Sequence, residues 1–419
     1  MSGTPLTVVG IGADGWAGLG ERAREALRAA RTIVGSQRQL DLLPDDLAAR
    51  RRLLPSPLEP LIDELASGVA EATCVVASGD PMLHGIGATL ARRIPPARLT
   101  VIPHPSAFAL ACARLGWPAA EVALVSAVAR EPEVIAQALQ PGRRIVAYAT
   151  GSDGAAQLAR VLRERGRGPS RFVVLEQLGG PAEQLRESTA DAWGDAAADP
   201  LHAVAIEVRA ASDALPLARV PGLPDDAYEH DGQLTKRHVR AITLAALAPL
   251  PGELLWDVGG GAGSIAIEWL RAETTARAVA VEADTERAQR IARNARTLGV
   301  PRLRVHHGRA PEALDEVDTA APDAIFVGGG VAAPGVLKRC WEALRPGGRI
   351  VADAVTLEGE QALVAARIRH GGTLLRIELS HAEPLGSLEG WKPQRPVVQW
   401  SARKPADGAG AVPLGEPAA

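Results

Sequence analysis

The chain has 419 residues, enough for two or three domains of ordinary size. Hydrophobic residues make up 47% and charged residues 23%, values that suit globular domains with sizeable cores. The formal net charge is −3, whereas a nucleic-acid-binding protein would usually carry a basic surplus, so a nucleic-acid partner is not expected. The three cysteines form no C-x-x-C pair, which argues against a disulfide framework and a zinc finger.

Targeting and metal-binding signals are also missing from the sequence. Residues 1–16 lead directly into a strand-and-glycine pattern, without the basic segment and apolar stretch of a signal peptide. No window approaches the roughly 18 apolar residues of a membrane span. The histidines lack metal-site spacing such as H-E-x-x-H. We therefore expect a cytoplasmic enzyme with no membrane partner and no metal.

Residues 1–210 alternate between apolar, β-rich runs and helical patterns, which predicts an α/β fold. Strands are expected at residues 7–9, 32–34, 73–77, 99–102, 122–125, 144–149, 172–175 and 203–208. Helices are expected at residues 21–31, 58–68, 85–93, 106–115, 131–139 and 154–166. One mononucleotide-binding half does not hold so many strands, so two small lobes that meet near residues 102–106 are predicted.

The rest of the chain divides by composition. Residues 211–231 carry three prolines among acidic and small residues, which is typical of a linker. A second α/β series occupies residues 232–403 and predicts a Rossmann-like domain. Residues 404–419 are rich in glycine, alanine and proline and are expected to form a flexible tail.

A glycine loop opens this second series. It follows a predicted strand at residues 254–258 and precedes a helix at residues 264–271. Glycines at this position let the backbone approach a ligand closely, beside the free N–H groups of the helix start. Glu282 ends the next predicted strand, 19 residues past Gly263, where an acid accepts hydrogen bonds from ribose hydroxyls. This pairing predicts an adenosine-containing cofactor.

The spacing of the loop discriminates between cofactors. A dinucleotide pattern that starts at Gly259 would need glycine in place of Ser264; the observed spacing is G-x-G-x-G. That spacing is similar to class I S-adenosylmethionine (SAM) methyltransferases, with an NAD-type Rossmann domain as the alternative. Three glycines, residues 328–330, follow the fourth strand instead of the Asp/Asn-Pro-Pro-aromatic motif of nucleic-acid amino-methyltransferases. Open space there suits a bulky ligand rather than a flipped base.

Four loops of the first half follow predicted strands in a characteristic order. They are Gly10–Gly15, the Ser78-Gly79-Asp80-Pro81 turn, the Pro105-Ser106-Ala107 loop and residues 176–183. This set resembles the tetrapyrrole (corrin/porphyrin) methylase family, which folds as two αβα lobes with SAM in the cleft between them. The sequence departs from that family where Ala13 replaces a common proline and where Val128-Ala129-Arg130 replaces a frequent His-Gly-Arg.

The second half, with residues 233–240 before its glycine loop and residues 382–393 near its end, resembles the small SAM-dependent methyltransferase that is the first module's partner in cobalamin synthesis. Together the halves resemble the family of fused, decarboxylating precorrin-6Y methyltransferases. The resemblance implies methylation of a corrinoid (precorrin) substrate at ring carbons 5 and 15, with loss of carbon dioxide from the ring C acetate arm. It also implies self-association into a homo-oligomer.

The resemblance implies two sets of SAM contacts. Those in the second half are Thr235, Gly259, Gly260, Gly261, Ala262, Gly263, Glu282 and Ala310. Those in the first half are Ala13, Ser78, Gly79, Asp80, Ser106, Ala107 and Ala149.

Catalytic residues are harder to assign, because a sulfonium methyl group is already activated and needs chiefly an aligned carbon nucleophile. Lys236 and Arg240 lie four apart on a predicted helix entry and share one face. Two interpretations remain open. One of the two side chains binds a substrate carboxylate, or both side chains lie on the solvent-exposed surface. His84, just past the Gly-Asp-Pro turn, is a candidate for the first cleft. The competing functions are methylation at a single carbon, and SAM or tetrapyrrole binding by a protein with one inactive module.

Overall fold

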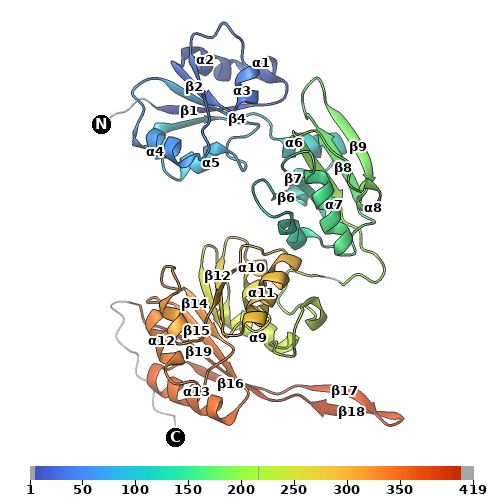
Figure 1. Ribbon diagram of the computed structural model, residues 1–419, viewed down its shortest axis with the longest axis vertical. Coiled ribbons are helices and arrows are strands. Elements are labelled where there is room, and N and C mark those ends of the chain that lie inside the picture. Colours follow the sequence, from blue (N-terminus) through green and yellow to red (C-terminus); the bar gives the residue numbers. More distant parts are fainter. Residues whose placement is uncertain (1–4, 216, 407–419) are drawn as a thin grey trace. The chain divides into compact units, whose positions relative to one another are not determined.

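A computed structural model describes residues 5–215 and 217–406 of the chain (Figure 1). Contacts between residues divide the chain into two units, Met1–Ala214 and Leu215–Ala419. The first unit contains two sheets and the second contains one large sheet with a separate hairpin.

The first lobe of the first unit is a parallel sheet in the order β3-β2-β4-β1-β5. Its strands are β1 (Leu6–Ile11), β2 (Thr32–Gly35), β3 (Arg50–Leu53), β4 (Thr73–Ser78) and β5 (Leu99–Ile102). Helix α2 (Glu21–Ala29) packs on one face, whereas α4 (Glu59–Ser67) and α5 (Ile86–Ala91) pack on the other. Because both faces are covered, β1 and β4 are nearly continuous apolar runs. Short helices α1 (Gly15–Gly18) and α3 (Gln37–Asp41) complete the lobe.

The second lobe is a mixed sheet in the order β6-β7-β10-β8-β9. Its strands are β6 (Val122–Ser126), β7 (Arg144–Tyr148), β8 (Arg171–Glu176), β9 (Gln184–Thr189) and β10 (His202–Glu207). Helix α6 (Ala107–Leu115), which follows β5 closely, packs on one face; α7 (Gly154–Glu164), α8 (Ala190–Trp193) and the 3-10 helix η3 (Pro132–Ala138) pack on the other. The predicted two-lobed α/β architecture is confirmed.

The second unit is built on a seven-stranded sheet in the order β13-β12-β11-β14-β15-β19-β16. Its parallel strands are β11 (Leu254–Val258), β12 (Arg277–Glu282), β13 (Arg304–His307), β14 (Ala324–Val327) and β15 (Arg349–Ala354). Strand β19 (Val397–Arg403) runs antiparallel between β15 and β16 (Thr373–Ile377). The strand order reverses between β11 and β14, and ligands of such sheets bind at the carboxyl ends of the strands beside this point.

Five helices cover the two faces of this sheet. Helices α9 (Arg237–Leu247), α10 (Ser264–Ala272) and α11 (Thr285–Thr297) share one apolar core with the sheet, and α12 (Val336–Ala343) and α13 (Leu357–His370) share the other. The hairpin of β17 (Ser380–Leu385) and β18 (Leu388–Pro393) extends away from the sheet (Figure 1). Its Trp391 is 78% exposed.

Several local predictions were wrong for identifiable reasons. Residues 132–138 form a 3-10 helix rather than an α-helix. The prediction missed edge strands β3 and β9 because both are polar: β3 begins with three arginines, and β9 alternates exposed and half-buried residues. The supposed linker contributes Leu223 and Tyr228 to the core of the second unit. In the supposed tail, Lys404 donates to the carbonyl of Leu344 at 2.7 Å, while residues 407–419 lie outside the described residues.

Candidate active sites

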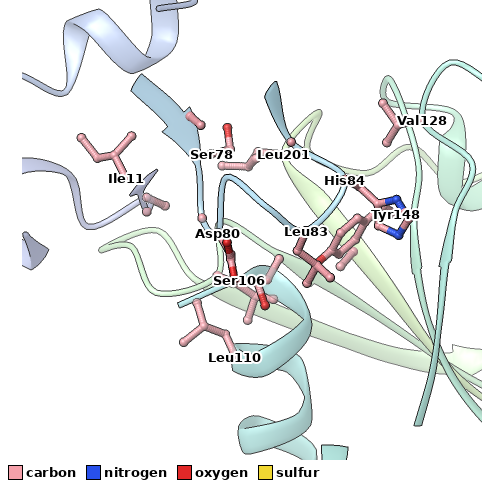
Figure 2. Close-up of a pocket in the computed structure, with 18 of the residues that line it drawn as sticks. Ile11, Ser78, Asp80, Leu83, His84, Ser106, Leu110, Val128, Tyr148 and Leu201 are labelled. Carbon is pink, nitrogen blue, oxygen red and sulfur yellow. The ribbon is translucent and has the colours of Figure 1, made fainter. Parts of the chain in front are cut away.

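The first unit holds a cavity of about 460 Å³ between its two lobes. Its walls come from the ends of β1 and β4, the loop from β5 to α6, and strands β7 and β10. Figure 2 shows Ser78, Asp80 and Ser106 gathered around this space with apolar side chains such as Ile11 and Leu110. The cavity is lined by every residue of the first half for which SAM contact is expected: Ala13, Ser78, Gly79, Asp80, Ser106, Ala107 and Ala149.

The backbone of these loops has little room for side chains. Gly79 has φ +56°, and a Cβ there would lie 3.1 Å from the Cα of Ser106. The turn after it is held by Asp80, whose Oδ1 accepts a hydrogen bond from the Met82 N–H at 2.8 Å. Ser106 caps α6 by accepting from the Ala109 N–H at 3.1 Å. Two tight loops from different strands therefore meet at the cavity wall.

His84 and Tyr148 are further polar residues of the same wall. Their rings lie edge to face, with centroids 6.2 Å apart (Figure 2). Burial, together with the positive charge of Arg130, lowers the pKa of His84. Burial raises the pKa of Tyr148, whose hydroxyl accepts from the Phe108 N–H at 2.9 Å. His84 thus lines the first cavity in a form suited to accept rather than donate a proton.

The second unit holds a larger cavity, about 970 Å³, at the carboxyl edge of its sheet. It lies beside the point where the strand order reverses, as the topology predicts. Of the SAM contacts expected in the second half, six line it: Thr235, Gly259, Gly260, Gly261, Glu282 and Ala310. Lys236 lines it as well.

Glycines allow two loops to approach each other at this cavity. Gly259 has φ +73°, and a Cβ there would lie 2.6 Å from the backbone nitrogen of Gly329. Beside this contact, the carboxylate of Glu282 is oriented by two backbone donors. Its Oε2 accepts from the Gly261 N–H at 2.8 Å and its Oε1 from the Asp284 N–H at 3.0 Å. The acid at the end of β12 is thereby fixed next to the glycine loop.

Ala262 and Gly263 do not line the cavity, contrary to expectation. Ala262 is buried, and its carbonyl accepts from Asn294 Nδ2 at 2.9 Å. Gly263 has φ +78° and starts α10, where its Cβ would clash with Ile291 at 2.8 Å. These two residues shape the end of the loop rather than its ligand-facing side.

Arg240 also departs from expectation, because its side chain is completely buried rather than facing substrate or solvent. Its Nε donates to Glu268 at 2.6 Å, and its guanidinium also contacts Asp225 at 3.2 Å. Glu268 in turn accepts from the Tyr228 hydroxyl at 2.8 Å and from the Leu223 N–H at 3.0 Å. Arg240 therefore ties the segment before α9 to α10, and a role in binding a substrate carboxylate is wrong for it.

Two buried carboxyl groups near the cavity have displaced pKa values. Burial raises the pKa of Asp257, in the middle of β11, to about 7, and the negative charge of Glu282 acts in the same direction. Burial raises the pKa of Asp353, near the end of β15, to about 6. Asp353 lines the cavity, whereas Asp257 does not. Sequence reasoning missed Asp353, although an acid at the carboxyl end of a parallel strand was a usable signal.

Within residues 5–215 and 217–406, no three His, Cys, Asp or Glu side chains gather in a way that could hold a metal ion. No described helix combines the length and apolar character needed to cross a membrane.

Comparison with known proteins assigns each half to a family. Residues 5–193 match the model of the tetrapyrrole (corrin/porphyrin) methylases, and residues 226–404 match a precorrin methyltransferase domain. A protein from Sinorhizobium sp. named "Precorrin-6Y C(5,15)-methyltransferase [decarboxylating]" is 45% identical over 396 residues, which cover 94% of this chain and 95% of that one. The chain belongs to this methyltransferase family. A Mycobacterium tuberculosis protein of the same name is 47% identical over 405 residues, covering 95% of this chain and 100% of the relative.

The crystal structure of the C-terminal domain of precorrin-6Y C5,15-methyltransferase from Rhodobacter capsulatus is 50% identical to this chain. It covers 45% of this chain and 100% of that domain, with a TM-score of 0.42.

Membership of this methyltransferase family removes the NAD-type alternative for the glycine loop of the second unit. Two of the positions at which the first unit departs from the tetrapyrrole methylase pattern lie on its cavity wall. Ala13 and Val128 line the first cavity, and Ala129 has φ +54°. The side chain of Ala13 occupies the space next to Gly180, where an added Cβ would lie 2.7 Å away. At the two cavity positions, 13 and 128, the side chain is smaller than the proline and histidine that the resemblance implies, whereas Ala129 is larger than the implied glycine and keeps a positive φ.

Proposed function

We propose that this protein transfers two methyl groups from SAM to precorrin-6Y, at ring carbons 5 and 15, and removes carbon dioxide from the ring C acetate arm. The observation that carries the proposal is the presence of two separate cavities, one per unit, in a chain similar over nearly its whole length to relatives named for both positions. Two methylations at distant carbons of one macrocycle are readily explained by two sites.

Both cavities fit SAM, although by different means. In the second, Glu282 presents a fixed carboxylate where ribose hydroxyls would bind, beside the exposed amides of the glycine loop. In the first, Gly79 and Ser106 bring two backbone loops together at an apolar cavity. SAM supplies an activated methyl group, and the chain must align the accepting carbon and exclude water.

The second cavity also fits a large macrocycle with several carboxylates. Lys236, Arg309 and Arg395 line it without an ion pair to any described residue. Its apolar wall includes Val239, Ile377 and Val397, which pack as one cluster. Unpaired cations around an apolar wall are suited to recognise carboxylates on the rim of an apolar ring system.

The same proposal includes the setting of the reaction. The precorrin is a small-molecule substrate, and the protein acts in the cytoplasm without a nucleic-acid or membrane partner. Self-association is proposed from the family resemblance. The hairpin of β17 and β18, with Leu385, Leu388 and Trp391 each at least 70% exposed, is an apolar surface available for it.

The deciding experiment incubates the full chain with SAM and precorrin-6Y and records product mass. The expected product gains two methyl groups and loses one carbon dioxide. Two variants block one cavity each: Ala107→Trp fills the first, and Glu282→Ala removes the ribose-binding acid of the second. Each is expected to yield a product with one methyl group fewer than the wild type makes. A wild-type product with a single added methyl group would instead support the single-position alternative.

A further inference from the structure

Asp353 is a carboxyl group in the wall of the second cavity. It is the penultimate residue of β15, at the carboxyl edge of the parallel strands that also carries the glycine loop and Glu282. Its side chain lines the same cavity as these groups and as the unpaired Lys236. A carboxyl group at this edge is positioned to meet a substrate that lies between the cofactor loop and the apolar wall.

Buried neutral donors orient this carboxyl group from behind. Thr243 of α9 donates to its Oδ2 at 3.0 Å, and Gln399 of β19 donates to its Oδ1 at 2.9 Å. Gln399 also donates to the Thr243 hydroxyl at 3.0 Å, which closes the network. Thr243 is fully buried and Gln399 is 3% exposed, so both donors are held rigidly. Such a network fixes the group without neutralising it by a cation.

The electrostatic surroundings keep this group partly protonated near neutral pH. Burial raises its pKa to about 6 even though both hydrogen bonds act to lower it. The facing residue of β19 is Gln399, the neighbouring positions of β14 are the apolar Phe326 and Val327, and α9 contributes Thr243. Two charged groups of the cavity wall are ion-paired, Arg287 with Asp231 and Lys392 with Glu383. The others are Lys236, Glu282, Asp284, Arg309 and Arg395. None of these makes an ion pair with Asp353 among the described residues.

Decarboxylation of an acetate arm needs a proton donor. The bond between the methylene and carboxyl carbons breaks, carbon dioxide leaves, and the macrocycle takes up the electron pair. The methylene carbon must accept one proton to become a methyl group. Until it does so, the macrocycle can return the electron pair to the carbon dioxide still in the cavity and re-form the bond, so protonation by the acid completes the decarboxylation. A carboxylic acid with a raised pKa is an effective donor for this step near neutral pH.

The first cavity is poorly suited to supply that proton. Its His84 has a lowered pKa and its Tyr148 a raised one, so the former is neutral and the latter is a weak acid. Its Asp80 is engaged by the Met82 N–H.

We propose that Asp353 is the general acid that protonates the methylene carbon released by decarboxylation, in the second cavity. The inference rests on the proposed function. Asp353 gives its proton to carbon and becomes a carboxylate, which the Thr243 and Gln399 donors stabilise, and it regains a proton from water between turnovers. The acid form must be present at the start of the step, so the rate of decarboxylation should fall as pH rises above the pKa of Asp353.

Asp353→Asn, made in the full chain, tests this role through product mass. The variant should still add methyl groups but should release a product one carbon dioxide heavier than that of the wild type. We expect decarboxylation to slow on the order of 100-fold or more, the usual contribution of a general acid. Asp353→Glu should restore part of the rate. Asp318→Asn, at an exposed position of the same unit, is the matched control and should behave as the wild type does.

Thr243→Val tests whether Asp353 acts as an acid, because a purely structural role of Asp353 would leave the pH dependence of decarboxylation unchanged. Valine has nearly the shape of threonine but cannot donate to Asp353, so the pKa of Asp353 should rise. The falling limb of the pH profile for decarboxylation should shift to higher pH in this variant and should be absent in Asp353→Asn. Calorimetric titration should find the same number of SAM sites in Asp353→Asn as in the wild type.

Two outcomes separate this inference from the proposed function. If Asp353→Asn decarboxylates at the wild-type rate, or if the pH limb is unchanged in Thr243→Val, Asp353 is not the acid and the proposed function stands. If the wild-type chain itself adds methyl groups to precorrin-6Y but never releases carbon dioxide, the proposed function fails first.

Discussion

Glu282 Oε2 accepts a hydrogen bond from the backbone N–H of Gly261 at 2.8 Å, so the acid that ends β12 is joined to the glycine loop that follows β11. The two strands are neighbours in the sheet, with Val258 paired to Val281. The contact therefore depends on register as well as on residue type. It sets the position of a carboxylate where a nucleoside ribose would lie.

Replacing Glu282 with Gln should weaken SAM binding at the second site. The amide keeps the shape but loses the charge that strengthens bonds to ribose hydroxyls, a loss of about 1.5–3 kcal/mol, or on the order of 10- to 100-fold in affinity. Isothermal titration calorimetry of the full chain should show two sites in the wild type and one unperturbed site in the variant. Glu286→Gln, at an exposed position of α11, is the control. Two unaltered sites in Glu282→Gln would contradict this assignment.

The positions of the glycine loop and of Glu282 could be predicted from the sequence because their determinants are local. A glycine loop between a strand and a helix, with an acid at the next strand end, is a short-range pattern, and Gly259, Gly261 and Glu282 lie where it predicts. The contact between Asp353 and Gln399 escaped prediction because the two residues meet only through the pairing of β15 with β19. That pairing depends on where the last strand inserts in the sheet, which residue patterns along the chain do not specify.

The wrong assignment of Arg240 has a related cause. Helical spacing places Lys236 and Arg240 near each other, but Lys236 is the N-cap of α9 and exposed, whereas Arg240 turns into the protein. The acid that holds Arg240, Glu268, lies 28 residues further along the chain. A proline-rich composition likewise suggested a linker where Tyr228 and Leu223 bond to that same buried glutamate. Long-range ion pairs of this kind leave no periodic signal.

Arg240→Met should destabilise the second unit strongly. The substitution leaves the carboxylate of Glu268 buried without its cation, and breaking a buried pair from one side costs about 3–5 kcal/mol. Hydrogen exchange of peptides from α9 and α10 should report the loss of stability in the full chain.

Lys236→Met is the contrasting variant, four residues away on the same helix entry. As an exposed, unpaired cation of the cavity wall, Lys236 should contribute less than about 0.5 kcal/mol to stability. Its replacement should instead raise the KM for the corrinoid. A stable Arg240→Met variant with a raised KM would reverse the assignment made from the structure.

Gly79→Ala should impair the SAM site proposed for the first cavity, because the added methyl group clashes with a neighbouring loop. Alanine at φ +56° costs about 1–2 kcal/mol, and its Cβ would also lie 3.1 Å from Ser106 Cα and 3.3 Å from the Pro105 carbonyl oxygen. The loop around Ser106 must shift, so SAM affinity at this site should fall on the order of tenfold or more. Fluorescence competition or calorimetry on the full chain would measure it.

Gly116→Ala is the control for Gly79→Ala, because it introduces the same backbone strain without the clash. Gly116 has φ +63°, nearly the same as Gly79, but a Cβ there would have nothing within 4 Å. This variant should lose a similar amount of stability and keep both SAM sites. Equal losses of SAM affinity in the two variants would show that general destabilisation, not the cavity wall, is responsible.

Asp257 should make the second unit less stable as pH rises from about 4 to about 7. Its pKa is about 7 in the folded protein because the carboxyl group is buried, and its Oδ1 has no hydrogen-bond partner among the described residues. An unfolded aspartate has a pKa of about 3.9, so between about pH 4 and pH 7 the folded state binds more protons than the unfolded state. The stabilising contribution is complete below about pH 4 and is lost by about pH 7, a change of order 2–4 kcal/mol.

Asp257→Asn removes this titration while keeping an acceptor for the Ala266 N–H, which lies 3.0 Å from Oδ2 in the wild type. The free energy of unfolding from urea titrations at pH 5 and pH 8 should fall more in the wild type than in the variant, whatever the variant's absolute stability. Asp353, which also has a raised pKa, contributes equally to both proteins and cancels in the comparison. If the free energy of unfolding changes equally with pH in the two proteins, Asp257 remains ionised in the folded chain. Strand β11 would then tolerate a buried charge beside Glu282.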